Sequence, residues 1–349
     1  MKDVINRVRD IRRATPAELK AFLTEIGEKS FRAKQIQEWL WQKSATSFAE
    51  MTNLSKSLRE RLAEHFVIRP VVVQESQRSG DGTIKSMFRL HDGHLVEGVL
   101  IPTSSRMTAC ISSQVGCSLS CKFCATGYMD RKRNLEAAEI YDQVVLIRQQ
   151  AEEYYGQPLT NIVYMGMGEP LLNYANVLQS VERITSPQGL GMSPKRITVS
   201  TAGIAKMIKK LGDDAVKFNL ALSLHAANDA KRSQIMPINA SNTLDALRDA
   251  LNYFYQKTGT RVTFEYIVFY NFNDTLEDAR ELWQFTRQVP SKVNIIEYNP
   301  ISEADFVNTE ADRLDQFAAF LEDRGVTVNV RRSRGKDIDA ACGQLAIKQ

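Results

Sequence analysis

The sequence predicts an α/β protein in which a small N-terminal all-α domain precedes a partial (β/α) barrel. Three observations predict this class. From residue 108 onward, strand-like segments alternate with amphipathic helical segments, which is typical of parallel strands joined by helical crossovers. Between residues 15 and 66 the apolar residues recur with helical spacing instead. The length of 349 residues is enough for two such domains and a large core.

The N-terminal region opens with a helix start signal. Thr15 is followed by Pro16 and Glu18, the order of an N-cap, a first-turn proline and a carboxylate that bonds back to the cap. We expect a second helix from Ser30 and a third around residues 54–62. This module is too small to host much chemistry by itself.

Positive charge is concentrated in the same region. Residues 1–70 hold 14 Lys and Arg against 9 Asp and Glu, although the whole chain carries a net charge of only +4. The basic residues of the later helices are Arg32, Lys34, Lys43, Lys56, Arg59 and Arg61. Such an excess fits a polyanionic partner or a solvated helical surface, and the composition favours neither.

A β-hairpin is expected between the helical module and the barrel. Residues 78–83 have the sequence RSGDGT, and Asp81-Gly82 is a hairpin turn signal between the strand-like sequences VVVQES and KSMFRL. A further strand is expected over residues 94–102. We place the domain boundary near Arg89, so that residues 1–89 form an accessory domain with its linker hairpin and residues 90–349 the catalytic domain.

The barrel strands can be assigned from their β-branched and apolar runs. They are expected at residues 108–113, 161–166, 196–201, 218–224, 262–269, 293–299 and 326–331. Amphipathic helices lie between them, for example over residues 135–154 and 244–255. In such barrels the ligands bind at the C-terminal ends of the strands.

The apolar runs are too short to cross a membrane, and the charged start MKDVINRVRDIRR lacks the apolar segment of a signal peptide. We therefore expect a cytoplasmic protein with no membrane association. Disulfides are rare in that compartment, and clustered cysteines there more often indicate a metal site or catalysis.

Four of the five cysteines lie between residues 109 and 127. Cys117, Cys121 and Cys124 have the spacing C-x3-C-x2-C and follow the first expected barrel strand, where a loop overhangs the barrel mouth. An iron–sulfur cluster normally takes four thiolates, so three leave one iron open. S-adenosylmethionine can chelate that iron through its amino and carboxylate groups, and an electron from the cluster can then cleave it to a 5′-deoxyadenosyl radical. This spacing, with an aromatic residue inside "CKFC", is the signature of the radical SAM superfamily.

A structural zinc ion is the alternative interpretation of these cysteines. Zinc would need a fourth ligand to close a tetrahedral site, and Cys110 is the nearest remaining thiol. Cys110 lies seven residues before Cys117 at a strand position, which makes this arrangement awkward.

Polar and glycine residues end several of the expected strands. In YMGMGEPLLN, over residues 164–173, Gly166 and Gly168 would let the backbone approach a small ligand, and Glu169 could accept from its ammonium group. A plain strand-to-helix turn with a capping carboxylate would have the same sequence. Further strand ends carry Ser200, the run Ser223-Leu224-His225, and Asn299. Each of these could be a turn residue alone.

Taken together, the motifs resemble one known family. CISSQVGCSLSCKFCATG, MGMGEPLLN, SLH, MPIN, YNP and DIDAACGQL are similar to the RlmN/Cfr family of radical SAM RNA methyltransferases, over nearly the whole chain. The resemblance implies a radical SAM barrel with a [4Fe-4S] cluster on Cys117, Cys121 and Cys124. It also implies an S-adenosyl-L-methionine site made of Gly168, Glu169, Ser200, Ser223, Leu224, His225 and Asn299.

The resemblance also implies roles for the two remaining cysteines. Carbon 2 of adenine is electron-poor and cannot attack a sulfonium methyl group, whereas a thiolate can. In the family scheme Cys342 is first methylated, and a second S-adenosylmethionine then yields the radical that takes hydrogen from this methyl group. The methylene radical adds to adenine, and Cys110 helps resolve the adduct by forming a Cys110–Cys342 disulfide. Glu97 matches the position of a proton acceptor in the family.

Within the family, the chain looks most like the members that methylate carbon 2 of adenosine in both 23S rRNA and tRNA. The implied partners are these RNAs and an electron donor such as flavodoxin with its reductase, with no stable protein partner. Methylation of carbon 8, which also occurs in the family, is one alternative, and no motif separates the two. A zinc-stabilised RNA-binding protein without catalysis is the other.

Overall fold

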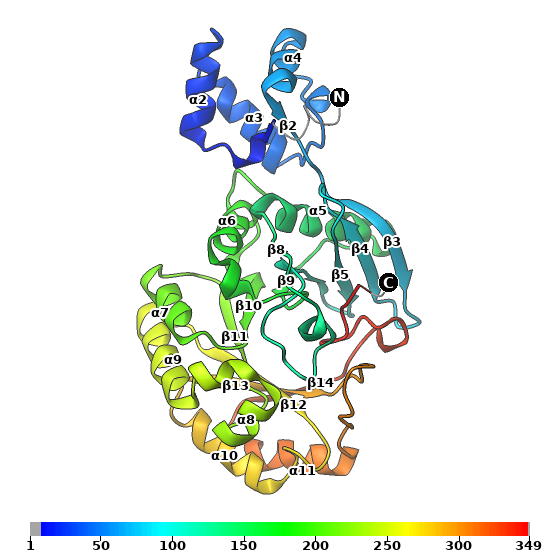
Figure 1. Ribbon diagram of the computed structural model, residues 1–349, viewed down its shortest axis with the longest axis vertical. Helices are drawn as coiled ribbons and strands as arrows, with labels where there is room; N and C mark the ends of the chain where they lie inside the picture. The colour runs from blue at the N-terminus through cyan, green and yellow to red at the C-terminus, as the bar shows by residue number, and fades with distance from the viewer. Residues whose placement is uncertain (1–7, 348–349) are drawn as a thin grey trace.

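The computed structural model describes residues 8–347 and consists of a small helical module above an open, curved α/β half-barrel (Figure 1). One ten-stranded sheet runs through the larger part, with the strand order β14-β13-β12-β11-β10-β9-β6-β5-β4-β3 among the described residues. The partial barrel with an N-terminal helical module is therefore confirmed.

The helical module follows the expected pattern closely. Its helices are α2 (Pro16–Glu25), α3 (Arg32–Trp41) and α4 (Lys56–His65), and a short parallel pair, β1 (Arg9–Asp10) and β2 (Phe66–Val67), closes it. Thr15 and Glu18 form the predicted reciprocal capping box at the start of α2. The second helix begins at Arg32, after an uncapped turn at residues 29–31, and not at Ser30.

Seven parallel strands in the described chain form the barrel wall. They are β6 (Met107–Cys110), β9 (Asn161–Tyr164), β10 (Ile197–Thr201), β11 (Asn219–Ser223), β12 (Val262–Val268), β13 (Ser291–Glu297) and β14 (Val328–Arg331). Each overlaps one of the seven expected segments, so these predictions are confirmed. Because all seven run in one direction, their C-terminal ends meet at one rim of the half-barrel.

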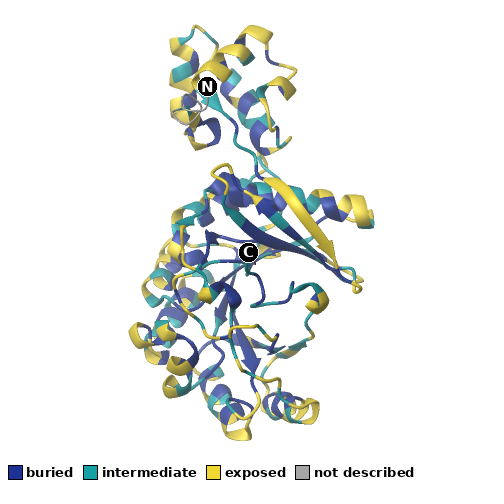
Figure 2. Cartoon of the chain, turned by 45° about the vertical axis from the view of Figure 1, so that its right-hand side comes forward, coloured by how far each residue is buried: buried dark blue, intermediate teal, exposed yellow. Residues whose placement is uncertain are grey.

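Helices cover the outer face of this wall (Figure 1). They are α5 (Ala137–Tyr155), α6 (Tyr174–Thr185), α7 (Ala205–Asp213), α8 (Asp229–Ile235), α9 (Leu244–Thr258), α10 (Leu276–Thr286) and α11 (Ala311–Glu322). Their apolar faces pack on the strands of the wall, as Figure 2 shows: β12 is buried along its whole length, whereas the edge strand β14 is only partly buried. Within residues 8–347, no helix combines the length and the apolar character that crossing a bilayer requires.

Three antiparallel strands extend the sheet beyond β6. They are β3 (Val72–Arg78), β4 (Ile84–Arg89) and β5 (Leu95–Pro102), and the predicted hairpin turn joins β3 to β4 with Gly82 at φ +89°. β3 is the edge strand and is exposed along its whole length (Figure 2). The domain boundary near Arg89 stays a prediction, and the strands on both of its sides belong to this one sheet.

The helical module is fixed to the barrel through a buried charge cluster on α5. Both oxygens of the Asp142 carboxylate accept hydrogen bonds of 2.8 Å from Nη1 of Arg12, and Asp10 pairs with the same guanidinium at 3.0 Å. Arg12 is only 6% exposed. Beside this cluster, the Tyr141 hydroxyl donates to the carbonyl of Trp41 at 2.5 Å. The module is therefore held by directional, desolvated contacts.

We predict that Asp142→Ala lowers the free energy of unfolding by about 3–5 kcal/mol, because it leaves a guanidinium buried against one carboxylate only. Glu38→Ala is the matched control, since Glu38 pairs with Lys43 on the surface and such pairs contribute at most about 1 kcal/mol. Denaturant unfolding monitored by circular dichroism measures both variants. Equal small effects would show that Arg12 does not anchor the module.

Candidate active site

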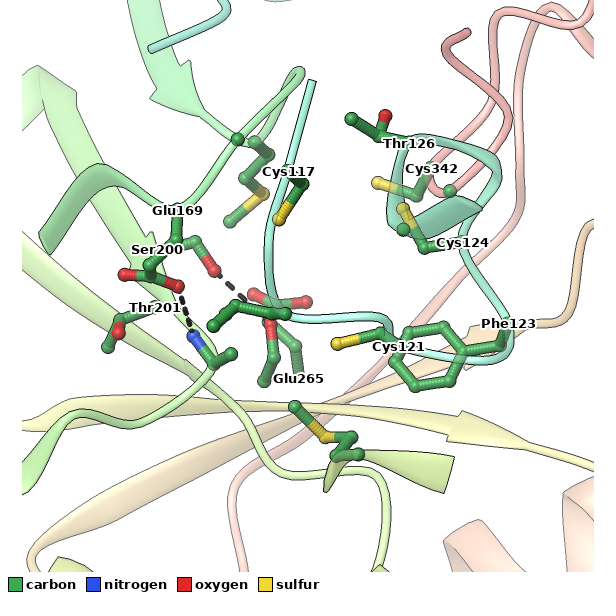
Figure 3. A pocket seen from close by; sticks show the side chains of 18 of the residues that line it. Cys117, Cys121, Phe123, Cys124, Thr126, Glu169, Ser200, Thr201, Glu265 and Cys342 are labelled. Carbon is green, nitrogen blue, oxygen red and sulfur yellow. Dashed lines mark hydrogen bonds between the residues drawn. The ribbon is translucent and has the colours of Figure 1, made fainter. Parts of the chain in front are cut away.

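A cavity of about 150 Å³ opens at the C-terminal rim of the parallel strands. Residues predicted for the site that line it are Cys117, Cys121, Cys124, Gly168, Glu169, Ser200, Ser223, His225 and Cys342. Figure 3 shows the cysteine loop, the strand ends and the C-terminal segment around this space. The structure thus brings together residues that are up to 225 positions apart in the sequence.

The cysteine loop is folded tightly against itself. It runs from the two-residue strand β7 (Gln114–Val115) to the 3-10 helix η3 (Ala125–Tyr128). Gly127 lies so close to the backbone of Cys121 that a Cβ would come within 2.6 Å of its carbonyl oxygen. Gly116 has φ +73°, and a Cβ there would lie 2.1 Å from the carbonyl oxygen of Asp130. Only glycine fits these turns, which fix where the three thiols lie.

The three thiols are in a desolvated environment. Burial raises the pKa of Cys117 to about 11, and burial also raises the pKa of Cys121 and of Cys124. Neutral thiols are therefore favoured until a cation binds, because a coordinating metal deprotonates a thiol outright. Three cysteine sulfurs around a cavity form a donor set suited to an iron–sulfur cluster.

No three His, Cys, Asp or Glu side chains in residues 8–347 are arranged to hold a single metal ion. Cysteine ligands of a cluster bind different irons, so their sulfurs need not converge on one point. Cys110, the fourth ligand of the zinc alternative, is buried at the end of β6 and does not line the cavity that the three loop cysteines line.

The glycine-rich segment after β9 forms the opposite wall. A Cβ on Gly166 would meet the carbonyl oxygen of Ile111 at 2.7 Å, and one on Gly168 would meet Gln114 at 2.4 Å, so side chains are excluded from this cradle. Glu169 is buried, and its two oxygens accept from the backbone N–H groups of Leu171 (2.9 Å) and Ala202 (2.8 Å).

The carboxylate of Glu169 thus caps the turn, as in the plain interpretation of its motif, and also faces the cavity (Figure 3). Burial raises its pKa. A cationic ligand group in the cavity would favour its charged form.

The ends of β10 and β11 contribute small polar groups. The hydroxyls of Ser200 and Ser223 lie 3.5 Å apart at the cavity wall. His225 has φ +56°, and its Nδ1 accepts from the N–H of Ile267 at 3.0 Å. Burial and the Arg232 guanidinium lower the pKa of His225 to about 3, so the ring is neutral. Leu224 is fully buried and is not among the residues that line the cavity.

Cys342 and Cys110 lie at the inner end of the site. Cys342 lines the cavity next to Cys124 (Figure 3), whereas Cys110 is the last residue of β6 and is buried. Burial, together with the nearby Cys342 thiol, raises the pKa of Cys110. Burial also raises the pKa of Cys342, and the Arg331 guanidinium acts against this for both thiols.

Asn299 lies behind Cys342. Its Nδ2 donates to the carbonyl of Cys342 at 3.1 Å, whereas its Oδ1 is buried without a hydrogen-bond partner in the described structure. A buried acceptor without a donor is costly, so this oxygen is suited to a donor from a bound ligand. Asn299 does not itself line the cavity.

Glu97 lies apart from the cysteine cavity. It is a buried residue of β5, and its Oε2 accepts from the N–H of Ala346 at 3.0 Å while Oε1 lies 3.6 Å from Nζ of Lys85. These residues line a second cavity of about 490 Å³ that the β3–β5 strands form with the C-terminal segment. The predicted role of Glu97 as a proton acceptor remains a prediction.

Sequence reasoning missed a charged pair on the cavity floor. Glu265 of β12 lines the cavity and accepts from Nη1 of Arg331 at 3.2 Å and from Nδ2 of Asn294 at 2.8 Å. A signal was present, because Glu265 is a carboxylate within the otherwise apolar strand VTFEYIVF. Its partner Arg331 is the last residue of β14 and could not be identified without the sheet order.

Comparison with known proteins identifies the family. Residues 10–68 match the ribosomal RNA large subunit methyltransferase N-terminal domain, and residues 111–282 match the radical SAM superfamily. A relative from Cytophaga hutchinsonii, named "Probable dual-specificity RNA methyltransferase RlmN", is 65% identical over 339 residues, which cover 97% of this chain and 93% of that protein. A relative of the same name from Bacillus licheniformis is 45% identical, covering 95% of this chain and 92% of that protein.

A solved structure is similar over almost the whole chain. The crystal structure of a radical SAM methyltransferase from Sphaerobacter thermophilus matches with a TM-score of 0.91 and 40% identity, covering 97% of this chain and 99% of that chain. The similarity therefore extends through both the helical module and the half-barrel. On these near full-length identities, the chain belongs to the RlmN family of radical SAM enzymes.

Proposed function

We propose that this protein is a cytoplasmic methyltransferase that methylates carbon 2 of adenosine in 23S rRNA and in tRNA through a methylated Cys342. The observation that carries the proposal is the position of Cys342, which lines the cavity beside the cluster loop and has the Cys110 thiol as an electrostatic neighbour. The relatives named as dual-specificity RNA methyltransferases support the substrate class.

Cys117, Cys121 and Cys124 would hold a [4Fe-4S] cluster, and the cradle of Gly166, Gly168 and the nearby strand ends would hold S-adenosylmethionine. When bound, these groups supply the methyl group and the radical chemistry, with two S-adenosylmethionine molecules used per turnover and the electron coming from a donor such as flavodoxin. The Glu169 carboxylate would bind the ammonium group of the cofactor, and the neutral ring of His225 adds no opposing charge.

The two cysteines outside the cluster loop would have different roles in the transfer of the methyl group. The Cys342 thiolate accepts a methyl group, and after loss of one hydrogen the same carbon bonds to the adenine. The adduct would then lose the hydrogen on carbon 2 as a proton and return its unpaired electron to the cluster. The Cys110 thiolate would attack the Cys342 sulfur as the bond between that sulfur and the former methyl carbon breaks. This carbon would take up a proton, which releases the methylated base and leaves a Cys110–Cys342 disulfide. The Arg331 guanidinium favours the thiolate form of both sulfurs, which a nucleophile requires.

We predict that substitution of the two cysteines blocks the reaction at different steps. Cys342→Ala removes the methyl acceptor, so neither methylated protein nor a protein–RNA adduct forms. Cys110→Ala still allows the adduct to form but not to resolve, so protein covalently joined to RNA accumulates as a nuclease-sensitive band on a denaturing gel.

The absorbance of the iron–sulfur cluster serves as the folding control for these two variants, and Cys117→Ala should abolish both that absorbance and methylation. If Cys110 were a zinc ligand, its removal would release metal and give no adduct. Normal turnover by Cys110→Ala would refute the two-cysteine mechanism.

The helical module would contact the RNA. The structure engages most of its basic side chains internally: Arg59 and Arg61 donate to the carbonyls of Ala49 and Ile26, and Lys43 pairs with Glu38. Lys29 and Lys34 are exposed and form no ion pair within residues 8–347. Phe31, between them, is 53% exposed, and an aromatic between cations suits a nucleic acid surface.

We predict that the double variant Lys29→Ala/Lys34→Ala weakens binding of rRNA fragments and tRNA alike, because phosphate contacts do not depend on sequence. The slope of log affinity against log salt concentration should become shallower by about 0.7–0.9 for each phosphate that the lysines no longer neutralise. Fluorescence anisotropy of labelled RNA across a series of salt concentrations measures both the affinity and this slope. Lys206→Ala/Lys209→Ala on α7 is the control, and an identical salt slope in both variants would exclude this surface.

A further inference from the structure

Both ends of the β3–β4 turn are buried, although β3 and the tip residues Gly80 and Asp81 are exposed. Every residue of β3 is exposed, whereas Ser79 is 6% and Thr83 0% exposed at the turn. The covering segment consists of residues 334–339, which lead directly to Cys342. In Figure 1 the C-terminal segment, drawn in red, lies beside the tip of this hairpin.

Two aspartates join the turn and this segment reciprocally. The Asp337 carboxylate accepts from the Ser79 hydroxyl at 2.6 Å and from the N–H of Gly80 at 3.0 Å. In the opposite direction, the Asp81 carboxylate accepts from the N–H of Gly335 at 2.9 Å. Hydrogen bonds to carboxylates are stronger than neutral ones, so the two segments are joined at three charge-assisted points.

The segment between this junction and Cys342 is compact. The carbonyl of Gly335 accepts from the N–H of Ala340 at 2.9 Å, which closes residues 335–340 into one turn around the 3-10 helix η7 (Lys336–Ile338). Gly335 has φ +68°, and a Cβ there would lie 2.8 Å from Cβ of Ala340 and 2.9 Å from Thr83. A displacement at the junction is therefore transmitted to the residues that precede Cys342.

On its other side Cys342 is tied to the cluster loop. The N–H of Ala125 donates to the carbonyl of Gly343 at 2.7 Å, and the Thr126 hydroxyl donates to the carbonyl of Leu345 at 2.5 Å. The segment that carries Cys342 is thus hydrogen-bonded on both sides, to the hairpin turn before Cys342 and to the cluster loop after it.

We propose that the β3–β4 turn is a positioning element for Cys342, with Ser79, Asp81 and Asp337 as positioning residues that hold the thiol between the cluster loop and Cys110. This inference rests on the proposed role of Cys342. The hairpin turn is more than two hundred residues from Cys342 in the sequence. It acts only by limiting where the loop that carries Cys342 can lie.

The test uses the full-length protein with its cluster reconstituted. Iodoacetamide alkylation of Cys342 is followed by peptide mass spectrometry, and diamide-driven formation of the Cys110–Cys342 disulfide is followed in parallel. In the Asp337→Ala variant, iodoacetamide should alkylate Cys342 about tenfold faster or more. Loss of one charge-assisted hydrogen bond already shifts the equilibrium between the held and the released Cys342 loop by about that factor. The same variant should form the disulfide correspondingly more slowly.

Two further variants keep the result specific. Asp337→Asn retains an acceptor for the Ser79 hydroxyl and should fall between Asp337→Ala and the unmodified protein. Asp323→Ala removes an exposed aspartate whose side chain forms no hydrogen bond or ion pair in the described structure, and it should change neither rate. The cluster absorbance and the alkylation rate of Cys110 are the controls for folding. If both are unchanged in a variant, faster alkylation of Cys342 reflects a local release of this residue and not general unfolding.

The proposal would be overturned if the alkylation rate of Cys342 in the Asp337→Ala variant were within twofold of the rate in the unmodified protein. If Asp337→Ala fails to retain its cluster, Ser79→Ala is judged by the same twofold limit. This variant removes one of the two bonds to Asp337, together with the 3.2 Å bond from the N–H of Asp81 within the turn. Failure of the proposed function is distinguishable, because it would appear as absence of RNA methylation by the unmodified protein, whatever the alkylation rates.

Discussion

The hydrogen bond from the N–H of Ala125 to the carbonyl of Gly343, 2.7 Å long, joins two segments that are more than two hundred residues apart. One segment carries the three cysteines of the cluster loop, and the other carries Cys342. A methyl group fixed on a protein sulfur can be used only if that sulfur reaches both the cofactor and the base. The position of Cys342 relative to the cluster loop therefore depends on this junction.

Burial sets the second condition on the site. It raises the pKa of all five cysteines, although a nucleophile and a metal ligand must both be thiolates. The two groups of thiols differ in what opposes this rise: cations of a cluster can deprotonate the three loop thiols, whereas the Arg331 guanidinium acts against the raised pKa of both Cys110 and Cys342. Its pairing with Glu265 holds the guanidinium in place, so a strand far from the cysteine motif contributes to the reactivity of the sulfurs.

Much of this arrangement was predictable from the sequence, because it depends on local patterns. The seven parallel strands followed from their alternation with amphipathic helices, and the cavity residues Glu169, Ser200 and Ser223 from their place at strand ends. The contacts that depend on pairing between distant segments were not predictable. No local signal links Arg12 to Asp142, Arg331 to Glu265, or the hairpin turn to the segment before Cys342. The place of Cys342 came from a family resemblance and not from its own residue pattern.

The central claim is that a carbon atom passes from Cys342 to carbon 2 of adenosine. It is tested most directly by incubating the reduced protein with RNA and S-adenosylmethionine deuterated in its methyl group, then analysing the nucleosides by mass spectrometry. The account predicts 2-methyladenosine whose new methyl group has lost at least one deuterium, since a hydrogen must leave the methylated Cys342. Methylation at carbon 8, or a transferred methyl group that keeps all of its deuterium, would contradict it.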